Sequence, residues 1–156
     1  MPPVTVLAVT SDDIDDLVTS VAGLFREDAG QRDPTVDLSW PARHGAEYYT
    51  AMISNPACLL VLARDGHHVI GHLAGRLNRP SSIQTEAVAV LESMRVAPES
   101  RRAGAGSLLV QYFFTWARDL GAHQASVTAY AANDVAQRFY ERHGFTPKSV
   151  TSRVAL

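Results

Sequence analysis

Residues 91–109 read LESMRVAPESRRAGAGSLL, and this stretch decides the fold. A β-prone segment ends at Val96, Pro98 interrupts it, and a loop with Gly104 and Gly106 runs directly into a helical pattern. Glycines let a backbone approach an anion closely, and the first turn of a helix presents unpaired amides at the positive end of its dipole. The stretch therefore predicts a strand, an anion-binding loop and a helix in succession.

Two well-known nucleotide loops do not match this stretch. No Gly-Lys-Ser/Thr sequence closes the loop, so it is not a P-loop. Leu109 stands where a dinucleotide fingerprint needs its third glycine, and no complete βαβ unit with a ribose-binding acid follows. Taken alone, the loop is also compatible with a tight strand-to-helix connection that binds nothing.

The rest of the chain alternates short β-prone segments with amphipathic ones. The turn at residues 64–68 predicts a hairpin, and residues 28–39 lack a period and predict a loop. We predict an α/β fold with a mixed sheet of about six to seven strands flanked by about four helices, in one domain over residues 1–156. Strands are predicted at residues 4–9, 59–63, 69–77, 87–96, 124–129 and 145–156, and helices at residues 11–25, 41–53, 108–120 and 134–143.

A second motif lies downstream of the glycine loop at residues 133–145, where an asparagine is followed by the sequence F-Y-E-x-x-G-F. Together with the valine-x-proline at residues 96–98 and an arginine-x-x-glycine-x-glycine at residues 101–106, it resembles the signature of the GNAT superfamily of acyl-CoA-dependent N-acetyltransferases. The order of elements also matches that fold over essentially the whole chain. One departure is Arg102, since this position is commonly glycine in the family. The matching residues are Val96, Pro98, Arg101, Gly104, Gly106, Asn133, Phe139, Tyr140, Glu141, Gly144 and Phe145.

The resemblance implies a site for acetyl-CoA as the acyl donor, with no metal. Backbone groups of Met94 and Val96 would pair with the pantetheine arm as an added strand does, and amides from Arg102 through Ser107 would hold the pyrophosphate. Asn133 would help to fix the last strand and helix around the thioester. The expected cofactor-binding residues are Met94, Arg95, Val96, Arg101, Arg102, Ala103, Gly104, Ala105, Gly106, Ser107, Asn133, Tyr140 and Arg142.

Tyr140 and Glu92 are the expected catalytic residues. The resemblance implies that Tyr140 donates a proton to the departing coenzyme A thiolate; without the motif it would be taken for a core aromatic residue. Glu92 is a charged residue in a mostly apolar strand, where burial would raise its pKa and suit it to accept the proton of an amine. A salt-bridged or edge carboxylate is the alternative for Glu92, and Glu86 is a weaker candidate for the base.

The expected acceptor is a primary amine on a small cationic molecule. Substrate choice in the family depends mostly on the first two helices and their connection, and acids with aromatics there suit a cation, although a solvated loop is the simpler interpretation. Two alternatives are a protein N-terminus or lysine as acceptor, and a non-catalytic acyl-CoA sensor, against which Tyr140 and Glu92 speak. The residues concerned are Glu27, Asp28, Asp33, Asp37, Trp40, Tyr48 and Tyr49.

Composition excludes several other classes of protein. The 156 residues are 46% hydrophobic with a net charge of −2, which argues against a nucleic-acid-binding surface, and no apolar run approaches the roughly 18 residues of a membrane span. The single cysteine, Cys58, excludes an internal disulfide and fits a cytoplasmic location. The histidines at positions 67, 68 and 72 lack metal-ligand spacing, so no metal site is predicted. A homodimer is compatible with the sequence.

Overall fold

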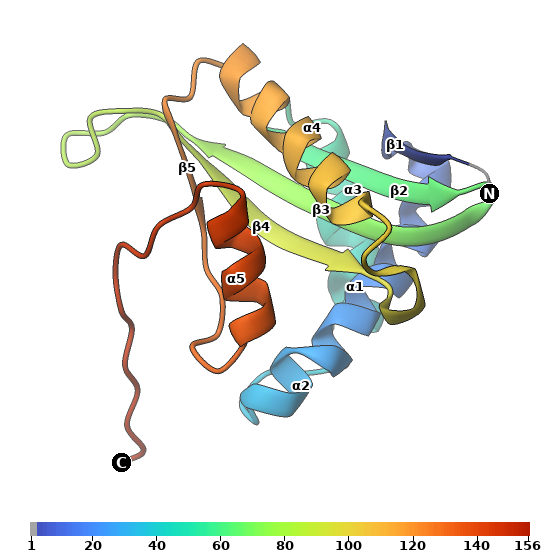
Figure 1. Cartoon of the computed structure of the whole chain (residues 1–156), viewed down its shortest axis with the longest axis horizontal. Coiled ribbons are helices and arrows are strands. Elements are labelled where there is room, and N and C mark those ends of the chain that lie inside the picture. Colours follow the sequence, from blue (N-terminus) through green and yellow to red (C-terminus); the bar gives the residue numbers. More distant parts are fainter. Residues whose placement is uncertain (1–2) are drawn as a thin grey trace.

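The computed structural model describes residues 3–156 and is built on one mixed sheet of five strands in the order β1-β2-β3-β4-β5 (Figure 1). All neighbouring strands are antiparallel except β4 and β5, which run parallel. The predicted α/β class is confirmed, with five strands instead of six to seven. The strands are β1 (Val4–Ala8), β2 (Cys58–Asp65), β3 (His68–Asn78), β4 (Val88–Val96) and β5 (Gln124–Val127).

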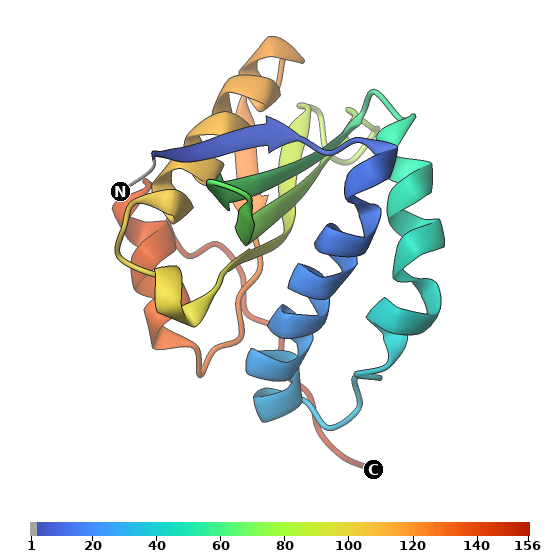
Figure 2. The same cartoon turned by 90° about the vertical axis from the view of Figure 1, so that its right-hand side faces the viewer.

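Helices cover both faces of this sheet (Figure 2). Residues 3–156 contain four longer helices, the short α2, two 3₁₀ turns at Ser11–Asp13 and Pro98–Ser100, and a π-helical turn at Pro41–Gly45 that leads into α3. α1 and α3 pack on one face and α4 packs on the other. The helices are α1 (Ile14–Glu27), α2 (Ala29–Arg32), α3 (Ala46–Ile53), α4 (Ala105–Asp119) and α5 (Asp134–Arg142).

The buried strand β2 shows how the sequence creates two cores. Its side chains alternate between the faces of the sheet, as the period of a strand requires. Val61 joins the core beneath α4, where Phe113 is fully buried. Leu60 joins the core beneath α1 and α3, where Leu17 and Val21 are fully buried at helical spacing. A strand apolar on both faces therefore has to lie inside the sheet.

The sheet opens between β4 and β5, and this opening positions the site. The two strands pair from Val88 to Leu91 of β4 and then separate. At the same point the register against β3 shifts, with Ala74 opposite Ser93 and Gly75 opposite Leu91, so that Glu92 is an extra residue in β4. A bulge of this kind re-aims a side chain and ends pairing. The bulge and the separation together place Glu92 at the mouth of the opening.

Two sequence predictions about connecting segments are wrong. Residues 28–39 contain the short helix α2 within the predicted loop. Residues 145–156 form no strand and run as an extended tail away from α5 (Figure 1). The tail is β-prone, but Val150 is 91% exposed and Val154 is 78% exposed, so neither is packed into a core. Arg153 instead binds Asp33, with 3.0 Å between a guanidinium nitrogen and Oδ2.

Within residues 3–156, no helix is long and apolar enough to cross a membrane.

Candidate active site

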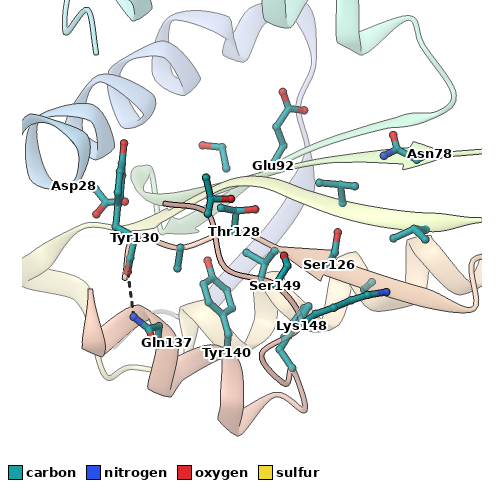
Figure 3. Close-up of a pocket in the computed structure, with 18 of the residues that line it drawn as sticks. Asp28, Asn78, Glu92, Ser126, Thr128, Tyr130, Gln137, Tyr140, Lys148 and Ser149 are labelled. Atoms are coloured by element: carbon teal, nitrogen blue, oxygen red, sulfur yellow. Dashed lines mark hydrogen bonds between the residues drawn. The ribbon is translucent and has the colours of Figure 1, made fainter. Parts of the chain in front are cut away.

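An open cleft of about 2370 Å³ extends along the opening between β4 and β5 (Figure 3). Its walls come from α1 and the segment after it, from α5, and from the C-terminal tail. Glu92 and Tyr140, the two predicted catalytic residues, both line it. Glu92 lies on β4 and Tyr140 on α5, 48 positions apart in sequence, so the fold brings them to one cavity.

Tyr140 stands on α5 with its hydroxyl directed into the cleft (Figure 3). Within the described chain that hydroxyl has no hydrogen-bond partner, while its ring packs edge-on against Phe139 and Phe145. Burial, with a smaller contribution from the charge of Asp28, raises the pKa of Tyr140 to about 12. The phenol is therefore protonated at neutral pH and is free to donate a hydrogen bond.

Glu92 is not the buried, unpaired carboxylate that its sequence context predicts. Its side chain is 32% exposed, it accepts a hydrogen bond from the Tyr48 hydroxyl, and its Oε2 lies 3.6 Å from Nε of Arg76. Arg76 also donates to the Tyr48 hydroxyl at 3.3 Å. The salt-bridged alternative thus describes the resting state of Glu92. The ion pair at 3.6 Å is partly exposed, so a bound cation could replace Arg76 as the partner of this carboxylate.

Four aromatic side chains form a wall of the cleft next to Glu92. The rings of Phe25 and Trp40 stack with centroids 5.8 Å apart, and Tyr48 lies edge-on to Trp40 at 5.3 Å. Tyr49 closes the group at 5.0 Å from Tyr48, and burial raises its pKa far above the usual range. Three of the four were predicted to contact the acceptor, and Phe25 was missed because it fits the apolar period of α1.

The acidic residues expected to attract a cation are mostly neutralised by arginines. Asp28 lies 3.1 Å from Arg32, Asp33 binds Arg153, and Asp37 lies 3.5 Å from an exposed Arg43. Glu27 does not line the cleft, so its predicted place at the acceptor site is wrong. These carboxylates therefore do not form a region of uncompensated negative charge. A cation would bind them by replacing an arginine.

The predicted phosphate loop lies outside the cleft, at the N-terminal end of α4. The first backbone hydrogen bond of this turn runs from the Leu108 amide to the Gly104 carbonyl at 3.1 Å. Amides from Arg102 through Ser107 have no backbone acceptor in the described chain. Together with the dipole of a 15-residue helix, they make a donor set suited to a phosphate.

The two glycines of the loop are needed for different reasons. Gly104 has φ of +86°, a backbone conformation that favours glycine. A Cβ there would meet nothing within 4 Å, so the space beside this residue is open. A Cβ on Gly106 would lie 3.1 Å from the ring of Phe139 on α5. Gly106 therefore allows α4 and α5 to pack closely. Its predicted role in the close approach of an anion stays a prediction.

The free edge of β4 supplies further backbone groups. The Ala97 amide donates to Ile70 of the neighbouring β3, and a Cβ on Gly71 would meet the Arg95 carbonyl at 2.4 Å, so residues 95 and 97 direct their backbone groups toward β3. By alternation, Met94 and Val96 direct theirs toward the edge that β5 has left. The Val96 carbonyl already accepts from Nε of Arg101 at 2.9 Å.

The remaining predicted cofactor residues have structural partners. Glu27 holds Arg95 at 2.6 Å and Arg101 at 3.2 Å, which turns the Arg95 side chain toward α1 and away from the cleft. The Arg95 hydrogen bonds, followed by the charges of both arginines, hold the pKa of Glu27 below its usual value. Asn133 caps α5 by accepting from the Ala136 amide at 3.1 Å and donates to Asp28.

Arg142 lies at the end of α5 with its guanidinium 5.9 Å from the Phe139 ring centroid. It does not line the cleft, and the same holds for Asn133 and for residues 94–96 and 101–107. Glu86, the weaker candidate for the base, lies at the far end of β4 beside Gln124 and is also outside the cleft. The structure therefore brings Tyr140 and Glu92 to one cleft, and the glycine loop does not line that cleft.

Arg102 is in the left-handed region with φ of 68°, and it is the only non-glycine residue of the described chain with positive φ. This explains why related sequences commonly have glycine there. We expect Arg102→Gly to raise the free energy of unfolding by about 0.5–1 kcal/mol, because the steric strain of a Cβ is relieved and only part of the gain is lost to a more flexible unfolded chain. Urea unfolding measures this. Arg102→Ala is the control, since it removes the charge but keeps the Cβ, and equal stabilisation by both variants would contradict the explanation.

Sequence reasoning missed three polar residues on the sheet. Arg76 and His72 lie on β3, and Ser93 follows Glu92 on β4. The signal was present, because a histidine and an arginine interrupt the otherwise apolar run at residues 69–77. The sequence predicts His72 within the strand at residues 69–77 and assigns it no role, and the structure buries it completely. Within residues 3–156 no group of three or more histidine, cysteine, aspartate or glutamate side chains is placed to hold a metal ion.

Solved structures with the same fold cover nearly the whole chain. A transcriptional regulator from Bacillus halodurans is 22% identical with a TM-score of 0.78, over 99% of this chain and 100% of that one. An aminoglycoside antibiotic 6'-N-acetyltransferase from Acinetobacter baumannii is 20% identical with a TM-score of 0.74, over 99% of each chain. An aminoglycoside acetyltransferase from an uncultured soil metagenomic sample, in complex with sisomicin, is 14% identical with a TM-score of 0.74, over 98% and 96%.

A search of curated proteins found no significant match. The model of the acetyltransferase (GNAT) family matches residues 24–145, a range that contains the glycine loop, Glu92 and Tyr140. The match spans well over half of the sequence, and the fold agrees with it along the entire chain. The chain belongs to the GNAT family of acetyltransferases.

Proposed function

We propose that this protein transfers the acetyl group of acetyl-CoA directly to a primary amine of a small molecule. The observation that carries the proposal is the shared cleft, which is lined both by Tyr140, whose unpaired hydroxyl points toward the opening between β4 and β5, and by Glu92. A sensor that only binds acyl-CoA does not need a hydrogen-bond donor for the thiolate or a carboxylate that takes a proton from an amine.

The residues present fit acetyl-CoA as the acyl donor. Unpaired amides from Arg102 through Ser107 supply donors for a pyrophosphate, and the guanidinium of Arg102 is exposed beside them. The edge groups of Met94 and Val96 supply pairing for an amide-containing arm, with the Val96 carbonyl shared with Arg101. The path from the loop along β4 ends at Glu92 and Ser93, where the cleft begins.

Two side chains account for the protons of the transfer. As the amine nitrogen bonds to the acetyl carbon and the carbon–sulfur bond breaks, Glu92 takes a proton from the amine, directly or through water. Tyr140 donates to the sulfur, which leaves as a thiolate. Full transfer from a phenol with a pKa of about 12 to a thiolate of ordinary pKa near 8.5 is uphill. The help of Tyr140 therefore comes mainly from a hydrogen bond that strengthens as charge grows on sulfur.

The acceptor is proposed to be a small amine carrying positive charge. Aromatic faces and exchangeable carboxylates surround Glu92, and cations bind favourably to both. The aminoglycoside acetyltransferases of the same fold are consistent with this class of acceptor. A location in the cytoplasm, where acetyl-CoA is made and thiols stay reduced, agrees with the single free Cys58.

Thiol release measured with a panel of amines tests the proposal. The panel contains sisomicin, spermidine, a lysine-containing peptide and a peptide with a free N-terminus, each with acetyl-CoA in excess. Turnover with a small amine and none with the peptides is the expected result. Preference for a peptide would move the acceptor to proteins, and tight binding of acetyl-CoA without turnover on any amine would favour the sensor.

The acyl-donor site can be tested at Gly104. We expect Gly104→Val to raise the acetyl-CoA dissociation constant at least about tenfold, because a branched side chain would project where a phosphate must approach the backbone amides. Isothermal titration calorimetry measures the change.

Gly121→Val is the matched control. Gly121 ends the same helix with φ of +83°, and a Cβ there also meets nothing within 4 Å, so both variants introduce the same kind of backbone strain. Only the Gly104 variant should lose affinity. Equal affinities in the two folded variants would remove the loop from the acetyl-CoA site.

A further inference from the structure

Two polar side chains are buried within residues 3–156, and they bind each other. His72, in the middle of β3, is 0% exposed, and its Nδ1 lies 2.6 Å from Oγ of Ser20 on α1. Its Nε2 lies 2.8 Å from Oγ of Ser93, which lines the cleft next to Glu92. A continuous hydrogen-bonded chain, Ser93–His72–Ser20, therefore leads from the cleft surface into the core.

The imidazole in this chain is neutral. Burial, and secondarily the charge of Arg95, lower the pKa of His72 to about 3. Arg95 is the charged group facing the ring, and Glu27 holds it in place. One ring nitrogen of a neutral imidazole donates and the other accepts. The imidazole of His72 therefore donates a hydrogen bond to one serine hydroxyl and accepts one from the other.

Both tautomers satisfy every group of the chain. With the proton on Nε2, His72 donates to Ser93, whose own hydroxyl proton can then point into the cleft. With the proton on Nδ1, Ser93 donates to Nε2 and presents lone pairs to the cleft. Ser20 adjusts by rotating its hydroxyl in either case. Ser20 is 3% exposed and has no other hydrogen bond in the described chain, so the chain has a closed end and no net proton leaves through it.

We propose that Ser93 binds the acceptor amine through its hydroxyl oxygen and that buried His72 is the positioning residue that orients this hydroxyl. The proposal rests on the proposed function, in which an amine reaches Glu92. Glu92 is the extra residue of the β4 bulge, so Ser93 follows it directly at the point where the sheet opens. An amine with one N–H directed to Glu92 and another to Ser93 has its lone pair aligned by two contacts, which reduces the orientational freedom lost at the transition state.

Removing the Ser93 hydroxyl tests this assignment. We expect Ser93→Ala to lower kcat/KM for the amine about 10- to 100-fold, the usual effect of losing a hydrogen bond to a charged or polarised partner. The dissociation constant of acetyl-CoA and the shape of the pH profile should not change, because His72 does not titrate in the assay range. Ser93→Thr should restore kcat/KM to within about threefold, since it keeps the hydroxyl.

Ser20→Ala is the matched control. It also removes one hydrogen bond from His72, but at the end of the chain that does not reach the cleft. It should lower the melting temperature and leave kcat/KM for the amine near the wild-type value. Equal losses of kcat/KM in Ser20→Ala and Ser93→Ala, or no loss in Ser93→Ala, would show that the chain serves packing alone and would overturn the assignment.

Imidazole ¹⁵N NMR of the wild type gives a readout besides activity. We expect one protonated and one bare ring nitrogen for His72 from pH 5 to 9, and a shift of its Nε2 signal when sisomicin or another turned-over amine is added with coenzyme A. A doubly protonated ring at pH 6 would contradict the proposal. A wild type that binds acetyl-CoA but acetylates no amine would overturn the proposed function and this assignment with it, whereas normal turnover in Ser93→Ala overturns only the assignment.

Discussion

We expect Tyr140→Phe to slow acyl transfer by about 10²- to 10³-fold, the usual effect of losing one hydrogen-bond donor to developing charge, while acetyl-CoA affinity stays near the wild-type value. The ring and its contacts with Phe139 and Phe145 remain, and only a hydroxyl without a protein partner is lost. Because burial raises the pKa of this hydroxyl to about 12, the wild type keeps its proton donor across pH 6 to 9. The deficit of the variant should therefore be the same at every pH in this range.

Single-turnover kinetics measures the chemical step without product release. Tyr130→Phe is the control, because Tyr130 lines the same cleft and the change removes the same group at another position (Figure 3). It should retain most of the activity. A loss of less than about threefold in Tyr140→Phe would mean that water or another group stabilises the thiolate, since one positioned donor is worth far more than that.

Glu92→Gln should lower kcat/KM for the amine by about 10²- to 10³-fold at neutral pH, where most of the amine is protonated and has to lose a proton. The rate of the wild type should rise with pH through one ionisation, and in the variant this rise should be displaced to the higher pH at which the amine itself loses its proton. At high pH the amine is already neutral and needs no base, so the two rates should converge. Lost structure would instead lower the rate at every pH.

The pairing of Glu92 makes a matched control necessary. Glu86→Gln makes the same change just before the same strand, outside the cleft, and it should leave the pH profile intact. Arg76→Ala removes the ion-pair partner of Glu92 and should increase the share of Glu92 free to bind an ammonium group. A pH limb that persists unchanged in Glu92→Gln would show that the proton leaves by another route.

The sequence predicted the loop, the helices and the class of fold because these depend on local chemistry. The turn before α4 requires a positive φ at Gly104. The apolar spacing of residues 108–120 gives α4 one side to bury, whichever element packs against it. Tyr140 was identified because it is part of a short motif, F-Y-E-x-x-G-F, within a predicted helix. Motif and periodicity each extend over a few residues, so neither depends on the rest of the fold.

The predicted terminal strand failed for the opposite reason. Residues 145–156 have β-prone composition, but a strand needs a neighbour, and pairing is a property of two segments. In the structure the tail lines the cleft and Arg153 holds Asp33, a contact across 120 positions that no local pattern contains.

The sequence by itself determined the order of the strands β1 to β5 and of the longer helices, the glycine loop at the start of α4 and the acetyltransferase motifs. The tertiary structure alone decided the chemical surroundings of the site. Whether Glu92 is buried or ion-paired depends on Tyr48 and Arg76, which lie 44 and 16 positions away, and the burial of His72 depends on α1 packing over β3. The electrostatic environment of a side chain is the sum of the effects of its neighbours in space. The packing of all the elements determines those neighbours, so no local stretch of sequence can reveal them.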